Sequence, residues 1–202
     1  PWTVTCLARM LAALHHTVHQ TGIDALPSQK ESLSYAITST SLLDDAAKEQ
    51  VLAILSRLPH GNTVCHGDFH PDNILLTSDG PVIIDWITCT NGTAAADIAR
   101  SQILMMKSAL PPGMHPITQR ILLRFRSLFY ATYIREYRKR SGITDDEINA
   151  WMLPVAAARL NENLFPEEVD LLLTIIRRYT ALSSPQKDKR QKEHETLHHT
   201  SR

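Results

Sequence analysis

The sequence predicts a predominantly helical α+β domain that contains one small β-hairpin. Apolar residues recur every three or four positions in several long stretches, which is the period of an amphipathic helix. Between residues 63 and 84 this pattern gives way to short β-branched and aliphatic runs on either side of the turn sequence Thr77-Ser78-Asp79-Gly80-Pro81. Asp-Gly between two hydrophobic runs is the strongest short-range hairpin signal. These observations place one pair of antiparallel strands among helices.

The composition narrows the class of protein. The chain has 202 residues, of which 43% are hydrophobic, and its 21 basic and 21 acidic residues balance. This is enough apolar material for one globular domain, and the balanced charge argues against a general nucleic-acid binder. Cys6, Cys65 and Cys89 are odd in number and widely spaced, as expected of reduced thiols in a cytoplasmic protein. No run of about eighteen apolar residues suggests a membrane span.

The first predicted helix covers residues 3 to 20, and Gly22 ends it. Its apolar side chains fall on one face, at spacings of three and four: Val4, Leu7, Leu11, Leu14 and Val18. His15 and His19 lie four residues apart, with His16 between them, and this spacing on a helix raises the question of a metal site. No acidic residue accompanies them in the sequence, so we expect ordinary surface or packing roles.

The next segment, residues 21 to 41, is rich in Ser and Thr and is predicted to be irregular. A second amphipathic helix is expected over residues 42 to 58, and Pro59-His60-Gly61-Asn62 ends it. Its inward positions are Leu43, Ala47, Val51, Leu55 and Leu58.

A polar loop follows, flanked by strands. Thr63-Val64-Cys65 leads into the segment His66-Gly67-Asp68-Phe69-His70-Pro71-Asp72-Asn73, and Ile74-Leu75-Leu76 leads out of it. Beyond the turn, Val82-Ile83-Ile84 folds back along the preceding strand and ends at Asp85. We therefore expect all three strands to converge on this loop.

Three oxygen-bearing side chains should meet at the mouth of this hairpin. Antiparallel pairing brings Asp85 beside Asn73, and Asp68 lies on the loop just before them. Each of these residues alone would usually be a turn residue that bonds its own backbone. Together, two carboxylates and an amide are the ligands that hold Mg²⁺ against phosphates and orient a hydroxyl for attack.

Helices are expected for most of the remaining chain. The first runs from Ala94 to Ala109 and carries Asp97, and Leu110-Pro111-Pro112-Gly113 closes it. A long helix from Pro116 to about Arg140 has Ile117, Ile121, Phe125, Leu128 and Thr132 on one stripe. Its many arginines, against the single acid Glu136, suit either an anionic substrate or partner or, as the simpler interpretation, a solvated face.

The last elements are marked by their start signals. Thr144-Asp145-Asp146-Glu147 is a capping box that begins a helix. Pro166-Glu167-Glu168 opens the final helix, whose inward positions are Val169, Leu172, Ile175 and Ile176. Residues 1–182 are expected to form one lobe, and residues 183–202 a disordered polar tail.

The stretch from Val64 to Asp97 resembles the catalytic loop of the aminoglycoside phosphotransferase and choline kinase group, the small-molecule branch of the protein-kinase-like fold. That group carries His-Gly-Asp-x-His-x-x-Asn, then a hydrophobic strand that ends in Asp, then a further Asp that opens a helix. The matching residues here are His66, Gly67, Asp68, His70, Asn73, Asp85 and Asp97. The kinase template has the same five-residue gap between its catalytic Asp and its metal-binding Asn.

The resemblance implies a role for each residue. Asp68 would accept a proton from, or orient, the attacking hydroxyl, and Asn73 and Asp85 would hold Mg²⁺ against the phosphates of ATP, with GTP as the alternative nucleotide. His66, His70 and Asp97 would be scaffold residues of the loop, His70 with less support. Leu75 and Ile84 would form the apolar floor under the base of the nucleotide. The reaction implied is transfer of the γ-phosphoryl group to a hydroxyl of a small molecule.

The sequence says less about the small molecule that accepts the phosphoryl group. In the resembled fold the late helices form walls of the substrate pocket, which makes Trp151, Arg159, Asn161 and Glu162 candidate contacts, although packing or surface roles fit them equally well. Many members of the group have acidic residues and a Gly-Asp-Pro segment after the metal-binding Asp. Here the segment from Trp86 to Thr93 has neither, which puts cationic acceptors such as aminoglycosides or choline in doubt.

An enzyme of this fold also needs an N-terminal lobe with a glycine-rich strand pair and a strand lysine over the phosphates. The residues before His66 have the pattern of helices and contain no such loop, so we expect the chain to be the C-terminal lobe of a longer protein. Two other functions stay open: a pseudokinase-like binding module and an atypical protein kinase. A transition-metal cluster of Cys65, His66 and His70 is disfavoured, because neighbouring residues on a strand point to opposite faces and no second ligand pair is present.

Overall fold

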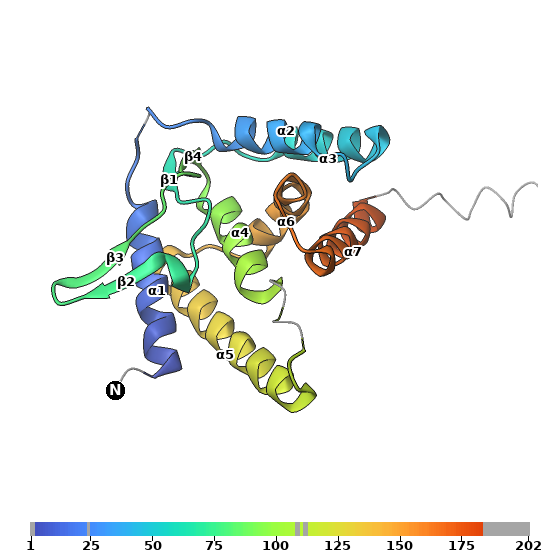
Figure 1. The fold of residues 1–202 in the computed structure, drawn as a ribbon. Helices are drawn as coiled ribbons and strands as arrows, with labels where there is room; N and C mark the ends of the chain where they lie inside the picture. Colours follow the sequence, from blue (N-terminus) through green and yellow to red (C-terminus); the bar gives the residue numbers. More distant parts are fainter. Residues whose placement is uncertain (1–2, 24, 108–109, 111–112, 184–202) are drawn as a thin grey trace, which may run out of the picture.

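The computed structural model describes residues 3–23, 25–107, 110 and 113–183. This part of the chain contains seven α-helices and two separate two-stranded antiparallel sheets (Figure 1). The predicted class, mainly helical with a small hairpin, is confirmed. The expected polar tail falls outside the described residues except for Ser183, which ends the last helix. Within the described part, no helix is both long enough and apolar enough to cross a membrane.

The first helix, α1 (Val4–His19), agrees closely with the prediction. The Thr3 hydroxyl accepts a hydrogen bond from the Cys6 amide and so caps the helix N-terminus. The buried face is not purely aliphatic, because His15 and His19 lie on it beside Leu11. This face packs against the second half of α5 (Pro116–Ser141).

The expectation that residues 21 to 41 are irregular is wrong, because α2 (Gln29–Ser39) lies within them. Ser28 caps this helix, accepting a hydrogen bond from the Glu31 amide. Only two of its residues, Gln29 and Ile37, are buried, so its apolar periodicity is weak. Packing against α6 (Asp145–Arg159), which no local pattern reveals, stabilises it.

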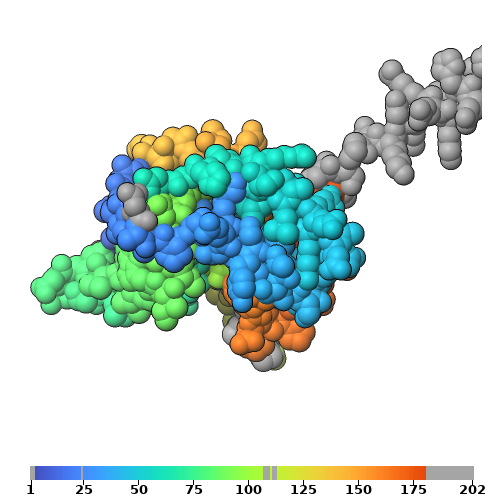
Figure 2. Space-filling model, turned by 90° about the horizontal axis from the view of Figure 1, so that it is seen from above, coloured from blue at the N-terminus to red at the C-terminus, as the bar shows by residue number. Residues whose placement is uncertain are grey.

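The second predicted helix is confirmed as α3 (Asp45–Arg57), which buries Val51 and Leu55. α2 and α3 lie side by side above α6, and Figure 2 shows them from above, where they form part of this face of the molecule. The Thr40 hydroxyl, between α2 and α3, donates to the carbonyl of Leu160 at 3.0 Å. The α2–α3 pair is therefore anchored to the end of α6.

The strands form two small ladders. β2 (Ile74–Thr77) pairs with β3 (Gly80–Ile83) in the predicted hairpin, with Ile74 opposite Ile83. This hairpin projects from the body of the molecule in both views (Figures 1 and 2). β1 (Thr63–Cys65) pairs with β4 (Thr90–Gly92), a strand that the sequence did not suggest. Its Thr90-Asn91-Gly92 sequence has turn residues rather than strand formers, so the pairing depends on the partner.

The helix α6 is the centre of the molecule. Its start at the Thr144 capping box is confirmed, and every residue from Trp151 to Leu160 is buried. α2, α3, α4 (Ala94–Lys107) and α7 (Pro166–Ser183) all contact it. In α7, Leu172 and Ile176 are buried as predicted.

The long helix α5 is confirmed, but its apolar stripe is largely uncovered. Ile117, Ile121, Phe125 and Leu128 are 50–62% exposed, and only Thr132 of the stripe is buried. The first half of α5 extends away from α1 and α6 (Figure 1). Tyr133 and Tyr137, from its second half, are fully buried against α1.

Candidate active site

The hairpin places Ile84 opposite Asn73, and Asp85 follows as the next residue at the same end of the hairpin. The Ile84 amide donates to the Asn73 carbonyl at 3.0 Å, which extends the ladder by one bond and leaves Asp85 as the next residue. Asp85 has φ of 61°, the left-handed region that is uncommon for a residue other than glycine. Such backbone conformations concentrate at functional sites. The Asp85 side chain is exposed at the mouth of the hairpin.

Asp68 and Asn73 are in direct contact. Asn73 ends the 3-10 turn Pro71–Asn73, and its Nδ2 donates both to the Asp68 carbonyl at 2.8 Å and to Asp68 Oδ2 at 3.0 Å. His70 Nε2 lies 3.4 Å from the same carboxylate oxygen. The hydrogen bond from His70 is the largest cause that holds the pKa of Asp68 below its usual value, against the opposing effect of partial burial, and Arg100 adds to it.

His66 is wholly buried and uses both ring nitrogens inside the loop. Its Nδ1 accepts the Asp68 amide at 3.2 Å, so its Nε2 carries the proton and donates to the Ile84 carbonyl at 3.0 Å. His66 thereby joins the residue before Asp85 to the residue at the centre of the loop. With both nitrogens engaged in this way, the Cys65–His66–His70 metal cluster is not formed.

Gly67 allows the turn that follows His66. Its φ is +78°, and a Cβ atom there would lie 2.5 Å from the Thr88 carbonyl oxygen. The Thr88 hydroxyl also donates to the His66 carbonyl at 3.0 Å. The β1–β4 pairing brings this neighbouring segment into place, so the unpredicted strand contributes to the shape of the loop.

Asp97 holds the loop from beneath. Its two carboxylate oxygens accept the amides of His66 at 2.7 Å and Gly67 at 2.8 Å. Oδ2 also accepts from Nε2 of His15 at 3.0 Å and of His19 at 3.1 Å. Burial raises the pKa of Asp97, but the hydrogen bonds from the two histidines outweigh it and hold this pKa well below the usual value.

The expectation that His15 and His19 have no acidic partner is therefore wrong. Asp97 is that partner, and it could not be found near them in the sequence because it lies 82 and 78 residues away. Burial lowers the pKa of His15 to about 3, so this ring is neutral. Its Nδ1 accepts the Tyr133 hydroxyl at 2.6 Å, and Tyr137 bonds His19 in the same way.

The ligand atoms of His15, His19 and Asp97 lie within 4.8 Å of one another, a spacing that a metal ion would accept. The hydrogen bonds of these three residues are enough to explain why their ligand atoms lie so close together. Both histidines have a tyrosine hydroxyl on Nδ1 and the Asp97 oxygen on Nε2. The packing role expected of these histidines thus has a specific form, a hydrogen-bonded support of the loop.

Arg100, one helical turn after Asp97, reaches the loop from its other side. Its Nε donates to the Gly67 carbonyl at 2.9 Å, and Nη2 lies 3.9 Å from Asp68 Oδ1. Nη1 forms an ion pair with Glu162, just beyond the end of α6. Sequence reasoning did not single out Arg100, although its position three residues after Asp97 on a helix places both on one face.

The candidate acceptor contacts separate into two groups. Arg159, which is 8% exposed, pairs with Glu162 at 3.0 Å and with Glu168 at 3.6 Å. Glu162 thus joins two arginines, next to the loop. Trp151 is 1% exposed and belongs to the hydrophobic core. This burial makes Trp151 a packing residue and leaves it no surface for a substrate, and Asn161 is exposed beyond α6.

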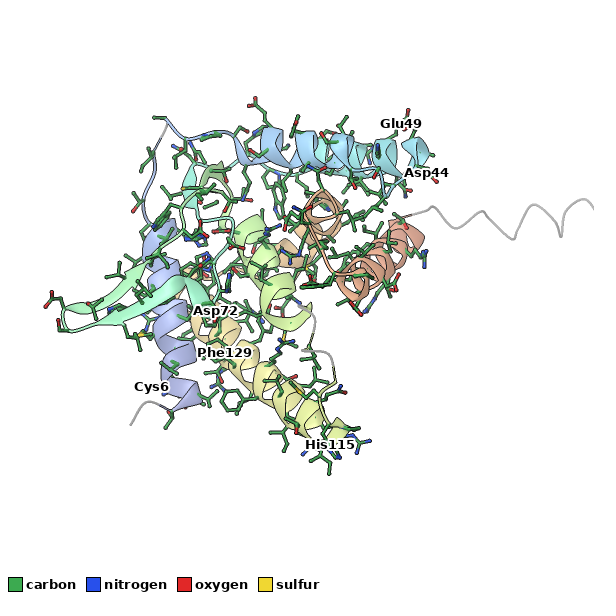
Figure 3. All side chains as sticks on the ribbon, viewed as in Figure 1. Cys6, Asp44, Glu49, Asp72, His115 and Phe129 are labelled. Atoms are coloured by element: carbon green, nitrogen blue, oxygen red, sulfur yellow. The ribbon has the colours of Figure 1, made fainter. Side chains whose placement is uncertain are left out.

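The two candidate nucleotide residues lie on the hairpin side of the loop. Leu75 is 49% exposed on β2, and Ile84 is half-buried just after β3. Asp72, from the 3-10 turn, and Phe129 of α5 line one pocket (Figure 3). The hairpin therefore presents an uncovered apolar surface beside the oxygen ligands.

A cavity of about 210 Å³ adjoins the other side of the loop. Gly67, Thr88, Arg100 and Glu162 border it, and α2, β4, α4 and α6 supply the remainder of its wall. The loop that carries Asp68 therefore lies between an exposed apolar surface on the hairpin and a partly open cavity among the helices.

Comparison with known families identifies this arrangement. A model of the "Phosphotransferase enzyme family" matches residues 3–142, more than half of the chain. The chain belongs to this family. The match includes α1, the catalytic loop, the hairpin, α4 and α5, and so confirms the family resemblance on which the sequence analysis relied.

One solved structure has the same fold as this chain. Amicoumacin kinase hAmiN, solved in complex with AMP-PNP, Ca2+ and Ami, matches 87% of this chain with a TM-score of 0.57 and 14% sequence identity. The protein-kinase-like fold that the resemblance implied is thereby confirmed. This chain spans 58% of the length of that kinase chain. A search of curated proteins finds no match.

Proposed function

We propose that this protein is an ATP-dependent phosphotransferase that moves the γ-phosphoryl group to a hydroxyl of a small molecule. Membership of the phosphotransferase family supports the reaction type. The observation that carries the proposal is the contact between Asp68 and Asn73 at 3.0 Å, with Asp85 at the same hairpin end. The AMP-PNP and Ca2+ bound to amicoumacin kinase agree with a nucleotide and a divalent metal here. GTP in place of ATP is compatible with the same residues.

Asp68 receives the acceptor hydroxyl. Its side chain is 27% exposed beside the loop, and its lowered pKa keeps it ionised at neutral pH. A carboxylate with a low pKa is a weak base but a strong hydrogen-bond acceptor. Asp68 therefore orients the hydroxyl for in-line attack and takes its proton as the oxygen–phosphorus bond forms.

Asn73 and Asp85 would hold Mg²⁺. With its Nδ2 donating to Asp68, Asn73 keeps its amide oxygen for a metal, and the exposed Asp85 adds a carboxylate. These hard oxygen ligands, few in number, suit an ion that also binds phosphates and water. Held by these two residues, the ion would supply positive charge that offsets the negative charge on the phosphates. Leu75 and Ile84 would lie under the nucleotide base, while His66, His70 and Asp97 support the loop.

In this proposal, residues 1–182 form the lobe that carries the catalytic loop. A second lobe covers the nucleotide. The chain spans 58% of the amicoumacin kinase chain. In the described residues, both sheets belong to the surroundings of the catalytic loop, and the apolar face of the hairpin is open. The isolated chain would then bind nucleotide weakly and turn over little.

The test is magnesium-dependent ADP release by the intact natural protein, screened against a panel of alcohols. We expect Asp68→Asn to lower acceptor-stimulated release by about 10²- to 10⁴-fold, the usual contribution of a general base. The matched control is Asp170→Asn, an exposed carboxylate on α7, which should retain wild-type release.

Two outcomes would contradict the proposal. Phosphorylation of peptides and of no small alcohol would indicate an atypical protein kinase. Nucleotide binding by the folded, intact protein without any ADP release above the Asp68→Asn level would indicate a binding module.

A further inference from the structure

The cavity beside Gly67 has an unusually uncharged wall for a site that would accept cations. Leu33 and Ala36 of α2 and Val155 and Ala158 of α6 provide its apolar part. Hydroxyl and amide side chains, among them Ser32 and Thr88, provide most of its polar part. The mixture is typical of pockets that bind small, partly apolar molecules with a few directed hydrogen bonds.

The three charged side chains in the wall are already neutralised. Asp97 is 1% exposed, and both of its oxygens accept hydrogen bonds from the loop amides. Glu162 pairs with Arg100, and its second oxygen accepts from Arg159 at 3.0 Å. The carboxylates that line this cavity therefore offer little uncompensated negative charge.

A cationic acceptor would have to displace Arg100 from Glu162. The displaced guanidinium is 16% exposed and would be left beside the incoming cation. Arg100 is largely buried whereas Glu162 is 38% exposed, so loss of the pair would leave a mostly buried guanidinium with less compensation than it has now, which is costly. An uncharged acceptor leaves the Arg100–Glu162 pair intact, because it can form hydrogen bonds with the hydroxyl and amide groups of the wall instead.

We infer that the part of the acceptor that enters this cavity is an uncharged, partly apolar alcohol rather than an ammonium-bearing group. This inference rests on the proposed function, because that function makes the cavity next to Asp68 the acceptor site. The missing acidic residues between Trp86 and Thr93 agree with it. The hydroxyl to be phosphorylated lies at the Gly67 side, nearest Asp68.

Two probes that differ only in charge test this inference. Choline and its neutral isostere 3,3-dimethylbutan-1-ol are titrated into the full chain, and amide shifts of the cavity residues are followed by NMR. We expect the neutral alcohol to bind at least as tightly as choline. The readout requires no turnover, so it stands even if the phosphotransfer proposal fails.

A charge variant sharpens the test. Ser32→Asp adds a carboxylate without a partner to the exposed α2 wall, away from the catalytic loop. It should tighten choline binding about two- to fivefold, the effect of one partly exposed charge, and should not tighten binding of the neutral alcohol. Ala46→Asp, exposed in the first turn of α3 and outside this wall, is the matched control.

Tighter binding of choline than of the neutral alcohol by the wild-type chain would overturn the inference. So would the absence of shifts at the cavity residues with both probes. If Ser32→Asp fails to fold, the comparison of choline with the neutral alcohol on the wild-type chain still decides between the two outcomes, because it needs no variant.

Discussion

At the scale of single residues, the catalytic loop is held by side chains that each make several directed bonds. His66 bonds one backbone amide and one carbonyl through its two nitrogens. Asp97 accepts two loop amides and two histidines. A loop cannot form its own ladder of hydrogen bonds, so side chains must satisfy its buried polar groups. This explains why so many buried polar residues gather around Asp68.

Arg100 provides a direct test of this account. Arg100→Met keeps much of the side-chain length but removes the donor to the Gly67 carbonyl and the pair with Glu162. We expect faster hydrogen exchange at the Asp68 amide, because the loop opens more often. Arg100→Lys should restore part of the protection, since it keeps the charge but lacks the planar fork.

The matched control for this prediction is Arg124→Met on the exposed surface of α5. It should leave exchange at the loop unchanged. Equal protection of the Asp68 amide in Arg100→Met and wild type, at equal global stability, would show that Arg100 does not position the loop.

At the scale of elements, periodicity identifies helices but does not determine how much of each helix is buried. The stripes of α5 and α7 have the same spacing, yet Ile121 is 62% exposed and Leu172 is 1% exposed. α7 packs against α6, whereas the part of α5 that carries Ile121 extends beyond α1 and α6. The position of a helix relative to its neighbours makes the difference.

This difference has a measurable consequence. Leu172→Ala should lower the free energy of unfolding by about 2–5 kcal/mol, because it leaves a cavity in the core. Ile121→Ala should change it by no more than about 0.5 kcal/mol, the usual range for surface positions. Urea unfolding of both variants under the same conditions measures the two values. Similar losses for both variants would mean that the stripe on α5 is covered in solution.

At the scale of the whole molecule, one buried network joins three helices to the catalytic loop. His15 and His19 come from α1, Asp97 from α4, and Tyr133 and Tyr137 from α5. Phe69 of the loop stacks on the His15 ring with centroids 3.8 Å apart. Docking of α1 on α5 and positioning of the loop should therefore be lost together.

The network predicts loss of stability in acid. An unfolded chain protonates His15 near its usual pKa of 6.5, whereas the folded state keeps it neutral down to about pH 3. The unfolded state thus binds more protons in this interval, and stability falls as pH falls from about 6.5, by up to about 1.4 kcal/mol per pH unit for one proton. Below about pH 4, protonation of Asp97 in the unfolded state adds to the loss, because its folded pKa is lowered as well.

Urea unfolding at pH 7 and pH 5 measures this effect. His15→Gln is the comparison, since its amide can still donate to Asp97 but does not titrate. We expect it to be less stable than wild type at pH 7 and to lose less stability between the two pH values. An equal loss in both proteins would mean that another group carries the pH dependence.

Local patterns in the sequence determined most elements and the residue types of the loop. Capping signals and apolar spacing located six of the seven described helices, and the Asp79-Gly80 turn predicted the hairpin at whose end Asn73 and Asp85 lie. The fixed spacing of His66, Asp68 and Asn73 led to the family, because this chemistry needs these residue types at short range along the chain. Each of these features depends on interactions between residues that are near one another in sequence.

Only the tertiary structure decided the features that depend on distant partners. α2 and β4 have weak local signals, and contacts with α6 and β1 stabilise them. The bonds from His15 and His19 to Asp97 span about 80 residues. Arg100 acquires its position from Gly67 and Glu162, and the exposure of the α5 stripe follows from where that helix lies. No spacing rule reports such contacts, because they arise when separate helices pack together.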